Sequence, residues 1–232
     1  MYYNASPIYF LIIAAMIVSW IIQWRLRSKM NTYGQIGLQS GLSGRQIAEL
    51  MLADHNITDV RVISTEGRLT DHYNPTDKTV NLSEAVYGER SAAAAAIAAH
   101  ECGHAVQHAT AYSMLQFRSA MVPALSSVSR FMPFILLAGV LMIRTSLIPL
   151  GVGIALFSLT TLFSFVTLPV EFDASRRALA WIDERGIVTA KEHAMAKDAL
   201  WWAAMTYVVA ALSSLATLLY YVSIFMGSRD RR

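Results

Sequence analysis

The stretch of sequence that decides the fold is SAAAAAIAAHECGHAVQHA, residues 91–109. Ser91 is a favourable helix N-cap, strong helix formers follow it, and no proline occurs until Pro123. The sequence therefore predicts a helix here. Alanine contributes little to membrane insertion, and His100 and His104 interrupt the run, so we expect this helix in a domain outside the membrane.

Two histidines in this helix have the spacing of metal ligands. His100 and His104 are four residues apart, so both imidazoles lie on one face and can reach one ion. In the pattern HExxH the glutamate, here Glu101, is a general base that takes a proton from the attacking water, whose pKa a zinc ion lowers to about 7. The alternative is a chance match with both histidines on a solvated face. The mid-helix position favours a Zn²⁺ site.

A catalytic zinc ion needs a third protein ligand and keeps one open position. Glu171 is the best candidate, because it opens the helix-like segment 171–186 directly after an apolar run. The alternative is an interfacial acid that pairs with Arg176 or Arg177. Cys102 is the single cysteine, which excludes a disulfide within the chain and a CxxC site. The remaining candidates for the third position are His108, His193 and Asp173.

The composition indicates a membrane protein, because 55% of the residues are hydrophobic and 15% are charged. The stretch Pro7 to Trp24 carries no charge and can cross most of a bilayer as a helix. Basic residues follow this stretch, whereas a cleaved signal peptide has them first, so we expect an uncleaved anchor. Three further spans are predicted at 119–143, 147–170 and 200–225.

These segments predict a mainly α membrane protein with about four transmembrane helices and a small α+β domain. In the α+β domain, residues 43–56 show helical spacing of apolar residues, and 58–64, 69–73 and 79–82 read as strands. The expected domains are an anchor (1–29), the α+β domain with the HECGH helix (30–118), a transmembrane hairpin (119–170), a helical segment with the third ligand (171–199), and a last transmembrane helix with a basic tail (200–232).

The hairpin of the second and third spans returns the chain to the membrane face from which it started. Glu171 is therefore expected on the same face as the HECGH helix. Ten Lys and Arg residues lie near the membrane ends on this face and four on the other, which predicts a cytoplasmic catalytic domain. Because the positive charges are scattered near membrane segments, we expect membrane lipids and no nucleic acid as partners.

Three parts of the sequence carry a resemblance to a known family: the HECGH helix, the preceding DHYNPTDKTVNLS and the later LPVEFDASRRA. With the arrangement of spans, they resemble the bacterial YugP-like family of neutral zinc metallopeptidases over nearly the whole chain. More distantly the chain is similar to the HtpX and CAAX-prenyl-protease group of gluzincins. The resemblance implies a gluzincin-like domain in a bacterial plasma-membrane protein. Its implied zinc ligands are His100, His104 and Glu171, with Glu101 as the base.

Where the distant group has an aspartate four residues after the ligand glutamate, this chain has Ser175. That carboxylate usually orients a ligand histidine through its second nitrogen, so Ser175, Asp173 or a backbone carbonyl must do so here. The segment Thr79 to Leu82 stands where gluzincin-like proteases have an edge strand. We expect it to bind an extended polypeptide substrate through backbone hydrogen bonds.

The sequence predicts a membrane-bound zinc endopeptidase that acts on membrane-associated or misfolded polypeptides. Two alternatives remain. A non-catalytic membrane scaffold with a structural zinc would not need Glu101 or an open coordination position. An intramembrane zinc protease would have HExxH inside a span, which the polar residues around the motif disfavour. Residues that could stabilise the oxyanion are His72, Tyr73, Tyr112 and His193, and the sequence does not choose among them.

Overall fold

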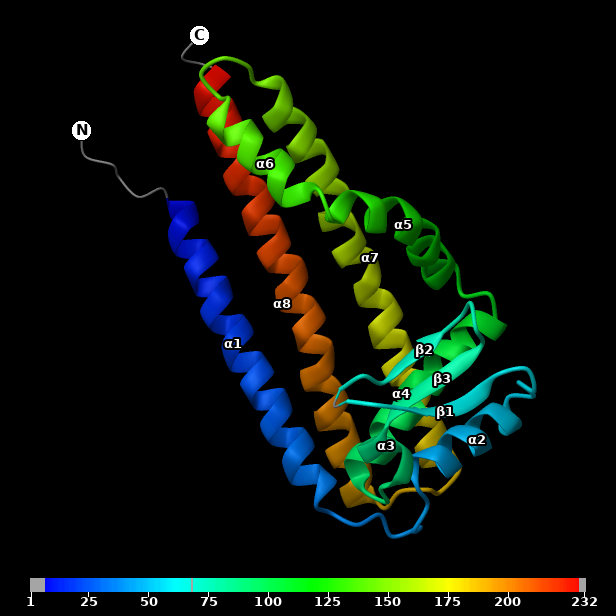
Figure 1. The fold of residues 1–232 in the computed structure, drawn as a ribbon. Coiled ribbons are helices and arrows are strands. Elements are labelled where there is room, and N and C mark those ends of the chain that lie inside the picture. Colours follow the sequence, from blue (N-terminus) through cyan, green and yellow to red (C-terminus); the bar gives the residue numbers. More distant parts are fainter. Residues whose placement is uncertain (1–6, 68, 230–232) are drawn as a thin grey trace. The chain divides into compact units, whose positions relative to one another are not determined.

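The computed structural model describes residues 7–67 and 69–229, which form a mainly helical chain with one small mixed sheet (Figure 1). The elements in chain order are α1 (Pro7–Gly34), α2 (Gly44–Asp54), β1 (Arg61–Thr65), β2 (His72–Asn74), β3 (Thr79–Ser83), α3 (Glu84–Gly88), α4 (Ala92–Ala109), α5 (Ser113–Ser129), α6 (Met132–Leu141), α7 (Ile148–Glu184) and α8 (Ala190–Arg229).

These elements form two compact units. Among the described residues, the first unit comprises 7–21, 117–168 and 206–229, and the second comprises 22–67, 69–116 and 169–205. The helices α1, α7 and α8 each contribute one part to each unit. Both histidines of the HECGH motif and Glu171 belong to the second unit.

Three described helices are long and apolar enough to cross a membrane: α1 from Phe10 onward, α7 and α8. The sequence predicts one more continuous span at 119–143. In the structure this region is divided between two separate helices, α5 and α6, with a bend of 53° between them. Pro133 lies in the first turn of α6. Proline lacks a backbone N–H and is tolerated at a helix start, which favours a new helix at this point. The pair is a broken span or a re-entrant loop.

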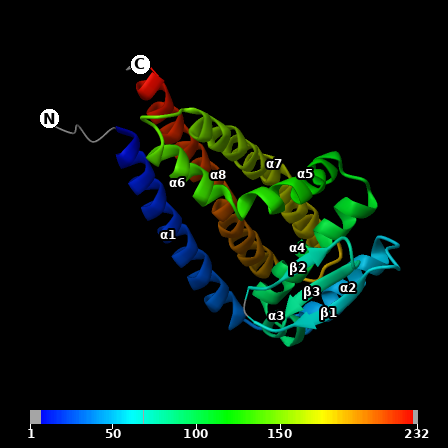
Figure 2. The ribbon, with the colours of Figure 1, turned by 45° about the horizontal axis from the view of Figure 1, so that its top comes forward.

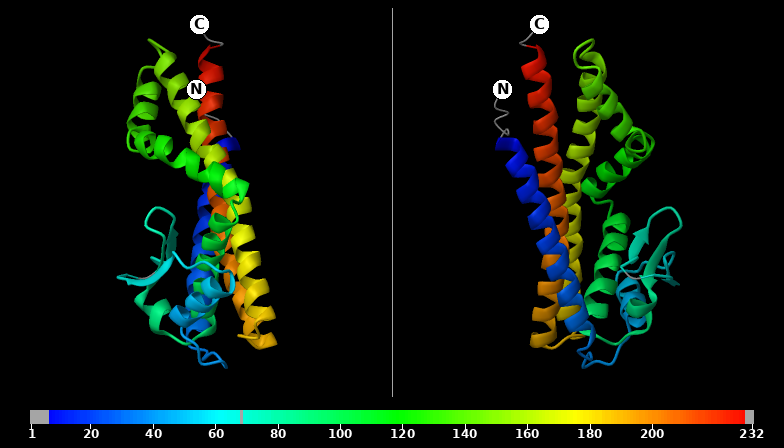
Figure 3. Two further views of the ribbon diagram at one scale, coloured as in Figure 1. Left: turned by 90° about the vertical axis from the view of Figure 1, so that its right-hand side faces the viewer. Right: turned by 60° about the vertical axis from the view of Figure 1, so that its left-hand side comes forward.

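The helix α7 continues without a break past the predicted end of the third span at Val170. Glu171 and the apolar stretch before it therefore belong to one continuous helix. The helix α8 is similarly continuous from the polar stretch that begins at Ala190. Figure 3 shows α7 and α8 side by side, and within the first unit Thr161 and Ser214 join them by a hydrogen bond of 2.7 Å.

The second unit contains the sheet and the main hydrophobic core. The strand order is β1-β3-β2, with β1 parallel and β2 antiparallel to β3. Both β2 and β3 contact α4, while β1 contacts α2 (Figure 2). The helix α2 begins with a capping box of Ser43 and Gln46. Its buried Ile47 and Met51 pack in one cluster with Val80 and the alanines of α4.

The prediction that Thr79 to Leu82 is an edge strand is wrong. This segment is β3, the central strand, and all five of its residues are buried. The two preceding strands pair with β3 from opposite sides, which a local sequence pattern does not reveal. The edge strand that contacts α4 is β2.

Candidate metal centre

The helix α4 places His100 and His104 one turn apart. Its N-terminus is capped by Ser91, whose Oγ accepts a hydrogen bond from the N–H of Ala94. The imidazole ring centroids of His100 and His104 are 4.8 Å apart. Cys102 is fully buried and donates from Sγ to the carbonyl of Ala48 on α2.

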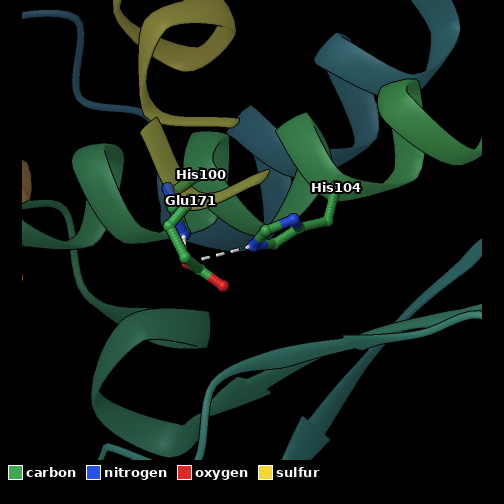
Figure 4. A group of neighbouring side chains, drawn as sticks. All are labelled: His100, His104 and Glu171. Atoms are coloured by element: carbon green, nitrogen blue, oxygen red, sulfur yellow. Dashed lines mark ion pairs between the residues drawn. The ribbon is translucent and has the colours of Figure 1, made fainter. Parts of the chain in front are cut away.

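Glu171 reaches these imidazoles because α4 and α7 cross in backbone contact. At Gly103 an added Cβ would lie 2.6 Å from the carbonyl oxygen of Ala174, so glycine is needed at this crossing. Glu171 Oε2 lies 3.3 Å from His100 Nε2 and 3.6 Å from His104 Nε2 (Figure 4). The structure therefore brings together the three residues that the sequence selects as ligands.

The geometry of this group fits a zinc ion. Ligand atoms at about 2.0–2.1 Å from a tetrahedral zinc are about 3.3–3.4 Å apart, close to the separations between Glu171 Oε2 and the two Nε2 atoms. Glu171 Oε2 is buried and has no hydrogen-bond partner. A buried carboxylate oxygen without a partner costs free energy, which a bound cation would offset. Two imidazoles and one carboxylate also form a ligand set of catalytic zinc sites.

The electrostatics of the group favour a positive charge between its members. Burial alone would lower the pKa of His104, but the contact with Glu171 and the nearby charge of Glu101 raise this pKa above its ordinary value. A proton on the imidazole is one way to supply positive charge, and a metal ion is another. Both compete for the same nitrogen.

The second nitrogen of His100 is held by Ser175, with 3.1 Å between His100 Nδ1 and Ser175 Oγ. Ser175 is the residue four positions after Glu171, where the distantly similar group has an aspartate. A serine hydroxyl thus contacts His100 in place of a carboxylate, as one of the sequence-based options predicts.

The second nitrogen of His104 is held by Gln107, which the sequence analysis missed. His104 Nδ1 lies 3.0 Å from Gln107 Oε1. The amide of Gln107 in turn donates to the carbonyl of Val170 at 2.8 Å and to Asp173 Oδ2 at 2.9 Å. The available signal was the i, i+3 spacing from His104 on one helix.

Arg176 and Arg177 do not pair with Glu171, which removes the alternative interpretation of that glutamate. Both arginines contact the carboxylate of Asp173, and Arg177 Nε lies 2.6 Å from its Oδ2. Asp173 is therefore occupied by Gln107 and two arginines. Within the described ranges, the group of His, Cys, Asp and Glu that could hold a metal comprises the two histidines of the motif and Glu171 alone.

The general-base candidate Glu101 is buried, with 8% of its surface exposed. It lies next to His100 in the chain but does not belong to the ligand group. This placement is consistent with its separate chemical role.

The other candidate residues lie in different surroundings. His108 Nδ1 is 2.7 Å from the hydroxyl of Tyr73 on β2. Tyr112 lies under the guanidinium of Arg177, with 5.8 Å from its Cζ to the ring centroid. His193 lines a groove between α7 and α8. None of these residues joins the metal-ligand group of the described chain.

Comparisons with known proteins identify the family of this chain. The family described as "Putative neutral zinc metallopeptidase" matches residues 8–226. The chain is 41% identical to "Putative membrane protease YugP" of Bacillus subtilis (strain 168) over 221 residues, which cover 95% of this chain and 97% of that protein. No solved structure matches the chain. The match over almost the whole length shows that this chain belongs to the family described as "Putative neutral zinc metallopeptidase".

Proposed function

We propose that this chain is a membrane-bound zinc endopeptidase of the gluzincin type. The observation that carries the proposal is the buried Oε2 of Glu171, which has no hydrogen-bond partner and faces two imidazoles at ligand separation. When bound there, zinc supplies two effects: it lowers the pKa of a water molecule and polarises a peptide carbonyl.

The residues of the chain divide the work. His100, His104 and Glu171 hold the metal, while Ser175 and Gln107 keep the two imidazoles in the orientation that directs Nε2 to it. Glu101 takes the proton of the attacking water and returns it to the leaving amine.

The edge of β2 is the proposed support for the substrate. Because β2 contacts α4 and pairs with β3 on one side, its other side can accept backbone hydrogen bonds from an extended polypeptide. This recognition makes small demands on side chains, which suits membrane-associated or misfolded polypeptides as substrates. The candidate spans support a location in the bacterial plasma membrane, and the Lys and Arg distribution favours a cytoplasmic catalytic domain.

The test uses two variants of the purified full-length protein. Glu101→Gln should retain zinc and lose about 10²–10⁴-fold of its casein or peptide cleavage, because only the base is removed. Glu171→Ala should lose zinc in elemental analysis. Unchanged cleavage in Glu101→Gln would reject the role of Glu101 as the general base. Full zinc affinity in Glu171→Ala would reject the third ligand.

The same experiment distinguishes the alternatives. A scaffold with a structural zinc would show no cleavage in any variant, although it binds the metal. An intramembrane site is disfavoured by the structure, because α4 is not among the candidate spans of the described residues.

A further inference from the structure

A cavity of about 690 Å³ lies in the second unit, beside the N-terminal half of α4. Its walls come from the end of α1, from α3, and from the residues between β1 and β2. Gly34, Ala85 and Leu69 represent these three walls, and Ala93 and Ile97 belong to α4. The wall from α1 is the C-terminal end of the first candidate span, which runs from Phe10 to Gly34.

The floor of the cavity is mainly apolar. Val86, Ala93 and Ala94 line it and are buried. Two buried serines also line it, and both have hydrogen-bond partners. The N–H and hydroxyl of Ser83 contact Asp71, and the hydroxyl of Ser91 accepts from the N–H of Ala94. Both buried polar side chains among the described lining residues therefore have hydrogen-bond partners already, which favours an apolar occupant.

The rim of the cavity is polar. Arg27, Gln35 and Glu89 line it and are exposed. The guanidinium of Arg27 and the carboxylate of Glu89 have opposite charges, so the rim selects neither a cationic nor an anionic side chain. Such groups can contact the backbone of a bound chain, while its side chain enters the floor.

The cavity lies at a distance from the metal centre that suits a neighbouring substrate residue. Ile97 and Ala93 precede His100 by three and seven residues, which is about 4.5 and 10 Å along the helix axis. An extended peptide advances about 3.3 Å per residue. A side chain in the cavity would therefore belong to a residue one to three positions from the bond that is cleaved.

The course of β2 connects the cavity with the metal centre. Leu69 and Asp71, just before β2, line the cavity beside Ala93 and Ile97. Farther along, Tyr73 contacts His108 of the same helix. The segment thus follows α4 past the metal-binding turn, and a peptide along its edge would pass both places.

We infer that this cavity is the subsite that binds a large apolar side chain of the polypeptide substrate, such as Phe or Leu, close to the cleaved bond. The inference rests on the proposed endopeptidase function. It adds a preference that the edge of β2 alone does not give: cleavage is directed to apolar segments, which are exposed in misfolded and membrane polypeptides.

The test places a phenylalanine side chain in the cavity by substitution of a residue in its wall. At Gly34 an added Cβ meets nothing nearer than Glu89 Oε2 at 4.0 Å, so Gly34→Phe can direct its ring into the cavity. The exposed Ala85 offers a second position, Ala85→Phe, on another wall. The matched control is Gly88→Phe, because Gly88 is exposed, has no atom within 4 Å of its added Cβ and does not line the cavity.

Each full-length variant is assayed with peptides that differ only by Ala, Leu or Phe at one position near the cleavage site. The wild type and Gly88→Phe should cleave the Leu or Phe peptide with a kcat/KM at least about tenfold above the Ala peptide at one such position. Gly34→Phe and Ala85→Phe should retain zinc and cleave the Leu and Phe peptides no better than the Ala peptide.

The two proposals fail in different ways. If the wild type cleaves peptides but both cavity variants keep the preference, the cavity is not the subsite, and the endopeptidase function stands. If zinc-loaded wild type cleaves no peptide, the function fails and the subsite fails with it.

Discussion

At the side chain of Gln107, one amide connects a metal-ligand candidate with another helix. Its Nε2 donates to the carbonyl of Val170 and to Asp173, both on α7. These two acceptors fix the orientation of the amide and leave Oε1 for His104. The proton of His104 is then held on Nδ1, so that Nε2 is free to bind a metal.

We therefore expect Gln107→Leu to bind zinc about 10–100-fold more weakly, because the imidazole of His104 loses the partner that fixes its tautomer and orientation. Competition with a chelator of known affinity measures this change. Gln116→Leu is the control, because Gln116 is an exposed glutamine of the same unit. Equal zinc affinity in both variants would contradict an orienting role for Gln107.

The sequence predicts the three candidate metal ligands, but it does not predict all of the residues that orient these ligands. The HExxH spacing places two imidazoles on one helix face, which is a local property. The contact of Gln107 with Asp173 joins residues 66 positions apart. A single glutamine on a helix has no local pattern that separates this contact from a solvated position. The contact of Ser175 with His100 could be predicted only because a related group has aspartate at that position.

Among the contacts between elements, the crossing of α4 and α7 decides whether Glu171 can reach the two histidines. Gly103→Ala would place its Cβ 2.6 Å from the backbone oxygen of Ala174, so α7 would have to move. We expect a loss of roughly 1–3 kcal/mol in the free energy of unfolding, together with weaker zinc binding because Glu171 moves with the helix. Denaturant unfolding and zinc titration measure the two effects.

Gly88→Ala is the matched control for this substitution. Its added Cβ has no neighbour within 4 Å, and replacing a helical glycine reduces the entropy of the unfolded chain. This variant should be as stable as the wild type or slightly more stable. If Gly103→Ala behaves in the same way, the close approach does not limit the site.

The positions of the helices and strands in the chain are easier to predict than the pairing of these elements with one another. The caps at Ser43 and Ser91 mark α2 and α4 because capping is a contact within a few residues. All three strands lie near their predicted positions. The order of the strands follows from pairing between distant segments, so the assignment of Thr79 to Leu82 to an edge had no local evidence and failed.

For the molecule as a whole, the metal centre constrains how often the chain crosses the membrane. His100 and Glu171 must emerge on the same face, so the chain between them has to cross an even number of times. The helix α7 is a candidate for one crossing before Glu171. The proposed zinc site therefore predicts that the bent pair α5 and α6 crosses as well, which would give four spans.

Cysteine labelling in intact cells tests this arrangement. The native Cys102 gives no background, because it is fully buried and burial raises the pKa of its thiol, which keeps the reactive thiolate scarce. Thr145→Cys lies in the exposed turn between α6 and α7, and Thr76→Cys lies in the exposed turn between β2 and β3. A membrane-impermeant maleimide should label Thr145→Cys directly and Thr76→Cys only after the membrane is opened. Labelling of Thr76→Cys alone in intact cells would reverse the orientation but keep four spans. Labelling of both positions from one side would mean that α5 and α6 do not cross, and the shared site of His100 and Glu171 could not form.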